Sequence, residues 1–393
     1  MISNIKILFF FIFILSGKYI IEISNYHVQV RYILLLPLTV MTAYLMKEIK
    51  FKFDLILIAI LFFCSTLIGS VFWNLDGSYA LEYFVDLIII LSIVIFVPAV
   101  LKNNDDLEYF LFLFVLTGLI YSILSILSVF SGTRDSLLLG GPNVTVRLIF
   151  LGLLSYFHIR KNLKINIQLI IILMAGVVAT GSRGGIISAS ICFLLYFIIN
   201  LKSNLKSIKL TFFMCVNIVF TFLILFYGYN NFKDEVDLLI RSRIIETIVE
   251  DLHFAGRDGL ILLSLNEIQQ NLFFGHGLAK YYDNAIGFHP HNLFIQLYLD
   301  IGMISFINFG IIIFALVSCA LNRDKIIFYT IPFYLIVHMV SGTYYDLRYM
   351  FIFWIVSNLT LKLDNDGLGR TRRIYKKVFS KNTRSARLHQ LHS

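Results

Sequence analysis

Long apolar runs separated by short polar loops fill most of the chain between Ile5 and Leu363, and one hydrophilic stretch at residues 229–291 interrupts them. A membrane-spanning helix needs about 20 mostly apolar residues. Because lipid cannot satisfy backbone hydrogen bonds, and barrel strands would be shorter with alternating polarity, we predict an all-α polytopic membrane protein. The twelve predicted spans are residues 5–22, 30–46, 53–73, 83–101, 107–130, 144–159, 165–180, 184–201, 209–228, 299–320, 326–342 and 348–362.

The same pattern divides the chain into four parts. Residues 1–228 hold nine predicted spans, 229–298 a large external loop, 299–362 three further spans and 363–393 a basic tail. The segment 1–15 resembles a signal peptide, but no small-residue cleavage site follows it, so we expect an uncleaved first span.

The distribution of charge predicts the orientation. Charged residues make up 15% of the chain, against roughly 25% in a soluble domain. One set of short loops holds twelve Lys and Arg and the alternate set six, while eight more lie in the tail. Both termini are therefore expected in the cytoplasm, and residues 229–291 outside. The net charge of +9 arises mainly from the tail, which favours contact with anionic lipid over nucleic-acid binding.

The external loop contains two predicted helices. Residues 237–250 place Leu and Ile at helical spacing against Arg and Glu, and residues 257–271 form a second amphipathic segment. The second segment ends in the glycine-rich sequence FFGHG at residues 273–277, which is typical of a helix stop. Two such helices at the membrane surface would form a lid over a cavity.

The sequence TGSRGG at residues 180–185 separates two predicted spans on the external side. One interpretation is a tight helix hairpin that needs glycines for positive φ, with Arg183 snorkelling to the interface. The other is an anion site, because a guanidinium beside backbone amides and a helix start is a good phosphate receptor.

Two further arginines are candidates for anion binding. Arg257 begins an amphipathic helix, where the helix dipole disfavours a cation, so a ligand anion would explain it, although solvated arginines are commoner. Arg147 lies near the start of the sixth span, where snorkelling is the commoner interpretation.

His291 precedes the apolar segment 293–299 and fits either a helix cap or a general base, since the unperturbed pKa of histidine is about 6.5. His276 and His289 compete for the catalytic role. A zinc site of these histidines lacks an HExxH pattern or paired carboxylates, so we expect no metal. The external side also lacks a DxD-type pair, which argues against a sugar-nucleotide donor. No disulfide framework is expected, because all four cysteines fall in predicted spans: Cys64, Cys192, Cys215 and Cys319.

The order of these segments resembles the bacterial O-antigen ligase and polymerase superfamily over about residues 141–348. The segments are TGSRGG, GRDGLILLSLNEIQQNLFFGHG and HNLFIQLYLDIGMIS. The ligase pattern runs His, then Asn, Ser or Gln, nine residues, Gly, two residues, then Gly, Thr or Tyr. His291, Asn292 and Gly302 match it, and Ser305 at the last position departs from it.

The resemblance implies a membrane enzyme with the glycosyltransferase C-like fold that uses no metal or cofactor. Such enzymes transfer glycans from an undecaprenyl-diphosphate carrier on the periplasmic side of the bacterial inner membrane. His291 resembles the family's catalytic base, and Arg183 and Arg257 resemble its two diphosphate-binding arginines. We add Arg147 as a third diphosphate-binding candidate, with Ser182, Gly184, Asn292 and Gly302 in support.

The resemblance leaves two acceptors open. A polymerase would present the glycan of a second lipid-linked repeat, and a ligase would present lipid A-core sugar. The 33 residues between Arg257 and His291 and the Phe/Ile/Asn/Lys-rich composition favour a polymerase. A chain-length regulator or a flippase is the expected protein partner. The rival class is a transporter of the same lipid-linked sugar, which would need repeated halves and charged residues near the midplane of several spans.

Overall fold

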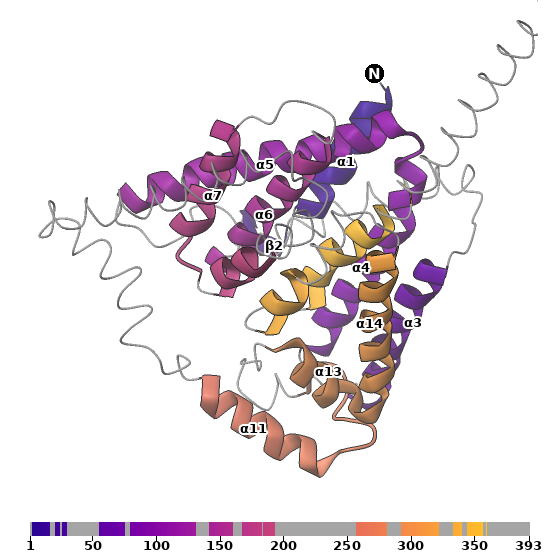
Figure 1. Cartoon of the computed structure of the whole chain (residues 1–393). Helices are drawn as coiled ribbons and strands as arrows, with labels where there is room; N and C mark the ends of the chain where they lie inside the picture. Colours follow the sequence, from indigo (N-terminus) through magenta and orange to yellow (C-terminus); the bar gives the residue numbers. More distant parts are fainter. Residues whose placement is uncertain are drawn as a thin grey trace, which may run out of the picture.

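Helices form nearly all of the regular structure that this computed structural model describes (Figure 1). The described residues are 2–15, 20–23, 26–29, 55–74, 79–130, 141–159, 167–182, 184–192, 257–280, 292–321, 333–339, 344–356 and 359. The helices follow the apolar runs of the sequence, as expected where backbone groups must be satisfied within each segment.

The first half of the chain contains α1 (Ile2–Leu15), α3 (Leu55–Gly69), the 3-10 turn η1 (Ser70–Trp73), α4 (Ala80–Val100), α5 (Asn104–Phe130), α6 (Pro142–Ile159) and α7 (Ile167–Ala179). The second half contains α11 (Arg257–Gln270), α13 (Leu293–Ile301), η4 (Gly302–Ile304), α14 (Ser305–Leu321) and η5 (Tyr344–Asp346). Residues 184–192, 333–339 and 347–356 are also helical.

Five stretches of the described residues are long and apolar enough to cross a membrane. They correspond to the third, fourth, fifth, sixth and tenth predicted spans, and their bounds are Leu55–Phe72, Ala80–Val100, Asn104–Val129, Pro142–Ile159 and Leu293–Phe314. Shorter apolar helices lie within the first, seventh and twelfth predicted spans. The second and ninth predicted spans lie outside the described residues, as does the predicted helix at residues 237–250.

The tenth span differs from its prediction. It begins at Leu293 rather than at residue 299, and it is broken into α13 and α14 by the short turn η4. The break occurs at Gly302, whose φ of +56° lies in the left-handed region that favours glycine. The apolar run continues through the break, so hydropathy alone does not reveal it.

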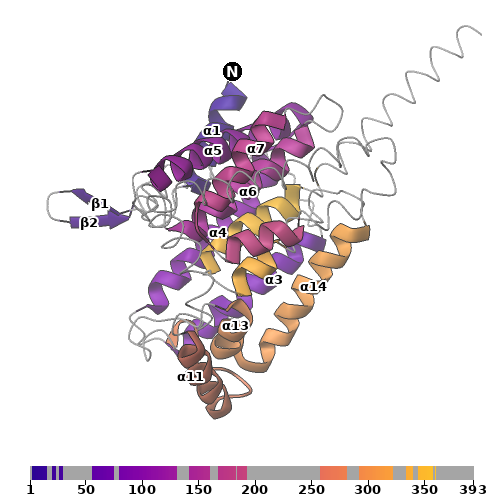
Figure 2. The same ribbon diagram turned by 60° about the vertical axis from the view of Figure 1, so that its left-hand side comes forward.

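A small antiparallel hairpin departs from the all-α prediction. Strands β1 (Ile20–Ile23) and β2 (Tyr26–Gln29) pair with Ile20 opposite Gln29, and Figure 2 shows them projecting from the side of the helices. We predicted a first span over residues 5–22, which includes most of β1, whereas α1 ends at Leu15. Ile, Val and Tyr favour strands, and the two residues between the strands, Ser24-Asn25, are common in turns.

Close contact between helices explains two glycines in the apolar runs. A Cβ atom on Gly152 of α6 would lie 2.8 Å from the carbonyl oxygen of Phe114 in α5, and one on Gly118 would lie 3.0 Å from the Gly152 Cα. Small residues at a helix contact let the backbones approach closely, which favours van der Waals packing between helices in lipid. Helices α5, α6 and α7 therefore form one packed group (Figure 1).

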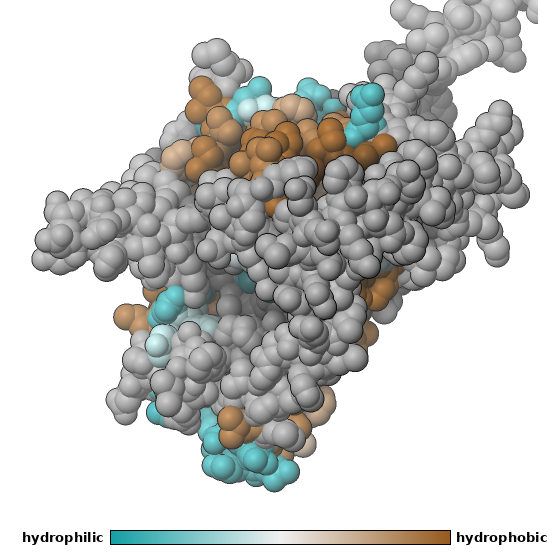
Figure 3. Space-filling model, turned by 90° about the vertical axis from the view of Figure 1, so that its left-hand side faces the viewer, coloured by the Kyte–Doolittle hydropathy of each residue, from teal (hydrophilic) through white to brown (hydrophobic). Residues whose placement is uncertain are grey.

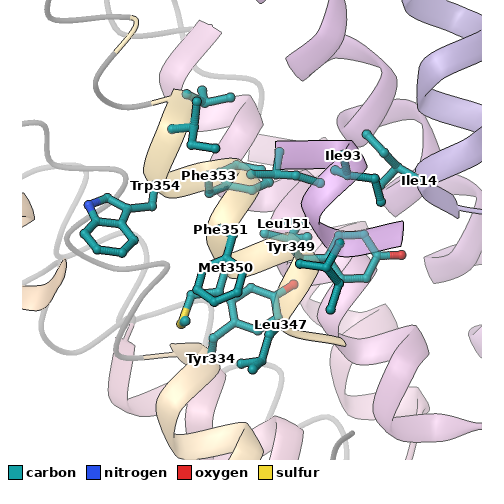
Figure 4. Packing of buried hydrophobic residues seen from close by; sticks show 14 of the residues in the cluster. Ile14, Ile93, Leu151, Tyr334, Leu347, Tyr349, Met350, Phe351, Phe353 and Trp354 are labelled. Atoms are coloured by element: carbon teal, nitrogen blue, oxygen red, sulfur yellow. The ribbon is translucent and has the colours of Figure 1, made fainter. Parts of the chain in front are cut away.

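Aromatic rings fill the interior between this group and the C-terminal helices. The rings of Phe150 and Phe333 stack at 4.1 Å, and Phe114 packs edge-on against Phe353 at 5.2 Å. Figure 4 shows the helix that carries Tyr349, Phe351 and Phe353 crossing this core. On the face that Figure 3 shows, the described surface is mainly hydrophobic at the height of α5 and mixes hydrophilic with hydrophobic residues at the height of α11.

Helix α11 lies at the end of the molecule farthest from α5 and packs against α13 (Figure 1). Its existence and start at Arg257 agree with the prediction, but none of the apolar side chains of α11 that the structure describes is buried. Leu263 and Leu265 are exposed, whereas Ser264 is buried. The second helix predicted for the external loop is therefore present, whereas the lid and the cavity beneath it stay predictions.

Candidate functional site

The turn around Ser182 packs against the first residues of α6. The Ser182 hydroxyl donates to the side-chain oxygen of Asn143 and accepts from the amide of Gly185 at 3.1 Å. Ser182 therefore caps the helix whose described residues are 184–192, because it satisfies an amide that the helix leaves unpaired.

The glycines of this turn are explained by different features of the structure. Gly181 has a φ of +65°, as the hairpin interpretation requires. Gly185 has no room for a side chain, because a Cβ atom there would meet Val146 of α6. Gly184 is buried at the helix start, and its carbonyl accepts from the Ser188 hydroxyl at 2.6 Å. Arg183 itself lies outside the described residues.

Arg147 lies in the first half of α6, and its side chain is 1% exposed. Its Nη1 atom is 2.7 Å from Oδ2 of Asp346 in η5. The snorkelling interpretation of Arg147 was therefore wrong, because the guanidinium points into the protein and is neutralised there. An unpaired charge at this position would lose its hydration without compensation. Whether Arg147 also binds a diphosphate stays a prediction.

Asp346 also faces a second buried arginine, Arg348, whose Nη1 is 3.7 Å from Oδ1. The Nε atom of Arg348 donates to the Ile14 carbonyl at 3.1 Å, and its Nη2 donates to the Tyr349 hydroxyl at 2.9 Å. One carboxylate thus joins α6 to the C-terminal helix, and Arg348 extends the link to the end of α1.

The same short turn reaches the large loop through Tyr344. The Tyr344 hydroxyl donates to Asp300 Oδ2 at 2.7 Å, and Oδ1 of that carboxylate accepts from the Ala279 amide at 3.2 Å. Burial, together with the adjacent Asp300 carboxylate, raises the pKa of Tyr344 well above its usual value, so the hydroxyl stays protonated as the donor. Asp300 is 2% exposed and is held by both contacts.

The segment 271–279 binds to the break between α13 and α14. The amides of His276 and Gly277 donate to the carbonyls of Leu299 at 2.7 Å and Asp300 at 3.0 Å. The Met303 amide in turn donates to the carbonyl oxygens of Leu272 and Phe273, which follow α11. These bonds satisfy groups that a helix end would leave unpaired.

Gly302 is needed because two backbones touch at this break. A Cβ atom on Gly302 would lie 2.5 Å from the amide nitrogen of Gly275 and from the carbonyl oxygen of Phe273. A Cβ atom on Gly275 would lie 2.6 Å from the Gly302 amide nitrogen. The glycine of the ligase pattern therefore has a structural reason in this chain.

Asn292 caps α13. Its side-chain oxygen accepts from the amides of Phe294 at 3.0 Å and Ile295 at 3.2 Å. The cap fixes where the helix begins, and His291 is the residue immediately before it in the sequence. His291 and His289 lie outside the described residues. The backbone of Arg257 is described as the first residue of α11, and its side chain is not.

His276, a competing candidate for the base, is engaged with the end of α11. Its Nε2 atom is 2.9 Å from the Glu267 carbonyl oxygen, and its Nδ1 atom is 3.3 Å from the Asn271 side-chain nitrogen. Both ring nitrogens therefore have neighbours within the loop, which fits a structural role.

These contacts form a continuous path through the candidate site. The path runs from the Ser182 turn to α6, from Arg147 to Asp346, and from Tyr344 to Asp300 and Ala279. All of these residues belong to segments that the charge distribution places near the external side. The structure thus gathers loops that are far apart in the sequence, and it does so through buried polar contacts.

Sequence reasoning missed the residues at the centre of this path, namely Asp300, Tyr344, Asp346 and Arg348. Asp300 had a recognisable signal, because a carboxylate between Leu299 and Ile301 in an apolar helix is costly unless it has a function or a partner. No signal in the sequence indicated the pairing of Asp346 with Arg147, since the two residues are about two hundred positions apart.

Among the residues that the structure describes, no group of three or more His, Cys, Asp or Glu side chains could hold a metal ion. Residues 168–310 match the family described as O-Antigen ligase, which confirms the resemblance to the O-antigen ligase and polymerase superfamily. The matched range includes the Ser182 turn, α11, segment 271–279 and α13, while Arg147 and Asp346 lie outside it. No curated protein matches the chain.

Proposed function

We propose, from the O-antigen ligase-type sequence of residues 168–310, that this multi-pass membrane protein transfers an undecaprenyl-diphosphate-linked oligosaccharide to a sugar hydroxyl. The transfer would take place on the periplasmic face of the inner membrane, in the synthesis of a surface polysaccharide. The observation that carries the proposal is the family match, because it spans the Ser182 turn, Arg257 and the His291-Asn292 pair together.

The proposed chemistry is a single in-line displacement with inversion at the anomeric carbon. His291 removes the proton of the acceptor hydroxyl as its oxygen attacks that carbon. The bond from the carbon to the diphosphate oxygen breaks, and the lipid diphosphate leaves. Arg183 and Arg257 neutralise the charge on this leaving group through charge-assisted, bidentate contacts. No carboxylate pair is needed, in contrast to glycoside hydrolysis.

The structure supports a positioning role for Arg147 within this proposal. Its guanidinium already binds Asp346, so it would fix α6 and the Ser182 turn beside the diphosphate. Ser182 and Gly184 would hold the start of the helix that follows Arg183, and Asn292 and Gly302 would hold α13 and its break. These four residues are thus proposed to place the reacting groups without touching the reacting atoms.

We propose a repeat-unit polymerase, with the joining of the glycan to lipid A-core as the alternative. Deletion of the gene followed by lipopolysaccharide gel analysis separates the two. A polymerase predicts that the ladder collapses to a single repeat on core, whereas a ligase predicts that no repeat is attached to core at all. An unchanged ladder would contradict both activities.

Transport of the same lipid-linked sugar is tested separately. The purified chain in liposomes should form a longer glycan when it is given lipid-linked repeats on the outer face, with no transport step needed. Movement of donor across the bilayer without any new glycosidic bond would contradict the transferase proposal in favour of a flippase.

A further inference from the structure

The turn that follows α11 exposes three successive apolar side chains among polar neighbours. Leu272 is 45% exposed, Phe273 67% and Phe274 68%. The preceding residues 269–271, of sequence QQN, are also exposed. Removing a phenylalanine side chain from water is worth about 1.5–3 kcal/mol. A turn with two such side chains in the open therefore calls for an apolar partner.

The backbone fixes this turn beside the start of α14. The amide of Met303 is 3.1 Å from the Leu272 carbonyl and 3.0 Å from the Phe273 carbonyl. The Gly275–Gly302 contact holds the next residues in the same place. The turn cannot lift away from the helix break without losing these contacts.

The turn is bonded to a candidate membrane span near residues of that span that are also exposed. Met303 is 46% exposed, Phe306 58% and Ile307 52%, and all three belong to the span Leu293–Phe314. Side chains exposed on such a span contact lipid, because no water is present at that depth. The turn at 272–274 thus borders a surface whose partner is the bilayer.

We infer that Leu272, Phe273 and Phe274 insert into the lipid interface beside the start of α14 and anchor the large loop to the membrane. We call these three residues the loop anchor. Aromatic rings favour this depth, where an apolar body meets lipid and polar neighbours remain hydrated. The polar residues 269–271 would stay in water above the anchor. A lipid surface fits better than a second copy of the chain, because the turn is bonded to Met303, an exposed residue of the candidate membrane span.

Tryptophan placed in the loop anchor and quenched by brominated lipid tests the inference on the full chain in liposomes. Phe273→Trp and Phe274→Trp are made in a parent with Trp73→Phe and Trp354→Phe, which removes both natural tryptophans. Phe306→Trp is the matched control for a lipid-facing site, and Gln269→Trp is the control for an exposed polar site. If the parent does not fold, the same substitutions are made in the natural protein. The quenchable fluorescence that each new tryptophan adds to that of the two natural tryptophans is then measured.

The expected result is that bromines in the upper part of the acyl chains quench the Phe273→Trp and Phe274→Trp variants at least as strongly as they quench the Phe306→Trp variant. Aqueous iodide should quench both anchor variants much less than the Gln269→Trp variant. Iodide quenching equal to that control would place the turn in water and overturn the inference. Quenching by neither lipid nor iodide would show that protein covers the turn, and it would overturn the inference as well. The result does not depend on the proposed reaction, so it can fail while that reaction stands.

Discussion

At the scale of single residues, the chain uses charge in two ways. Arg147 and Arg348 share the Asp346 carboxylate inside the protein, where their role is to join segments. Arg183 and Arg257 were identified from their sequence positions at helix starts, and their diphosphate role stays a prediction. Arginine suits both tasks, because its planar group binds two oxygens at once and keeps its charge when buried.

Replacement of Arg183 by lysine should be nearly as damaging as replacement by alanine. A flexible ammonium group cannot reproduce a bidentate contact to a diphosphate, and loss of one such donor costs roughly a hundredfold to a thousandfold in turnover. Transfer by the purified variants measures this, and Arg257→Lys should behave in the same way. Arg160→Lys, in a predicted cytoplasmic loop, is the control and should keep full activity. Full activity in Arg183→Lys would mean that the site needs only positive potential.

Replacement of His291 by alanine should lower turnover by about a hundredfold to ten-thousandfold, the usual share of general-base catalysis. Binding of the lipid diphosphate should change little, because the arginines are proposed to hold it. The pH profile should lose its acidic limb, since that limb reports deprotonation of the imidazole. His276→Ala and His289→Ala serve as comparisons and should be milder. A normal ladder from His291→Ala at natural expression would remove His291 from the mechanism.

Asp346→Asn should destabilise the protein, because it removes the carboxylate charge that two buried guanidinium groups contact. Breaking a buried ion pair on one side costs roughly 3–5 kcal/mol. Thermal unfolding in detergent measures the loss, and Asp105→Asn at an exposed position on α5 is the matched control. An unfolding temperature equal to that of the control would show that the Arg147–Asp346 contact contributes nothing to stability.

At the scale of elements, the hydrophobic pattern predicted most described helices, because in lipid each segment must satisfy its own backbone. The start of α11 at Arg257 was predicted from an amphipathic pattern, and the helix after Asn292 from its apolar residues. The broken tenth span did not follow, because its break depends on carbonyls that bond to a segment more than twenty residues earlier. The β1–β2 hairpin was missed because β1 lies largely within the apolar run that we assigned to the first span, while β2 lies in the short loop predicted after that span.

Gly302→Ala should disrupt the helix break. The new Cβ atom would lie 2.5 Å from backbone atoms of the loop, and the φ of +56° would be strained for alanine. A drop in expression and unfolding temperature is expected. Gly310→Ala in α14 is the matched control, because no atom lies within 4 Å of its added Cβ. Equal behaviour of the two variants would contradict the close contact of Gly275 with Gly302.

At the scale of the whole molecule, the sequence predicted that the candidate site residues share one side of the membrane. The structure adds the contacts that hold those segments together, through Asp346 and Asp300. Such contacts could not be predicted, because they depend on which loops the packed helices bring into reach. The sequence placed Arg147 correctly at the start of a span, and its partner became visible only in three dimensions.

A topology experiment tests the arrangement at this scale. A reporter fused after Ser393 should be active in the cytoplasm, and a cysteine placed at Asp283 should react with a reagent that does not cross the inner membrane. Both follow from the excess of Lys and Arg in one set of loops. The control is a cysteine placed at Asn204, in a predicted cytoplasmic loop, which should react only after the membrane is opened. Reaction of position 283 only after opening would reverse the orientation.

The hydrogen bonds between segment 271–279 and the α13–α14 break limit where this chain can be joined to a related protein in a chimera. Amides of the loop complete the hydrogen bonding of carbonyls at the end of α13, so the loop replaces part of the missing helical turn. A transplanted loop with different spacing would leave those carbonyls unpaired, at a cost of several kcal/mol each in lipid. In chimeras of related proteins, residues 271–304 should therefore be exchangeable only as one intact segment. Chimeras that cut within it should fail to accumulate, whereas those that cut outside it should be tolerated.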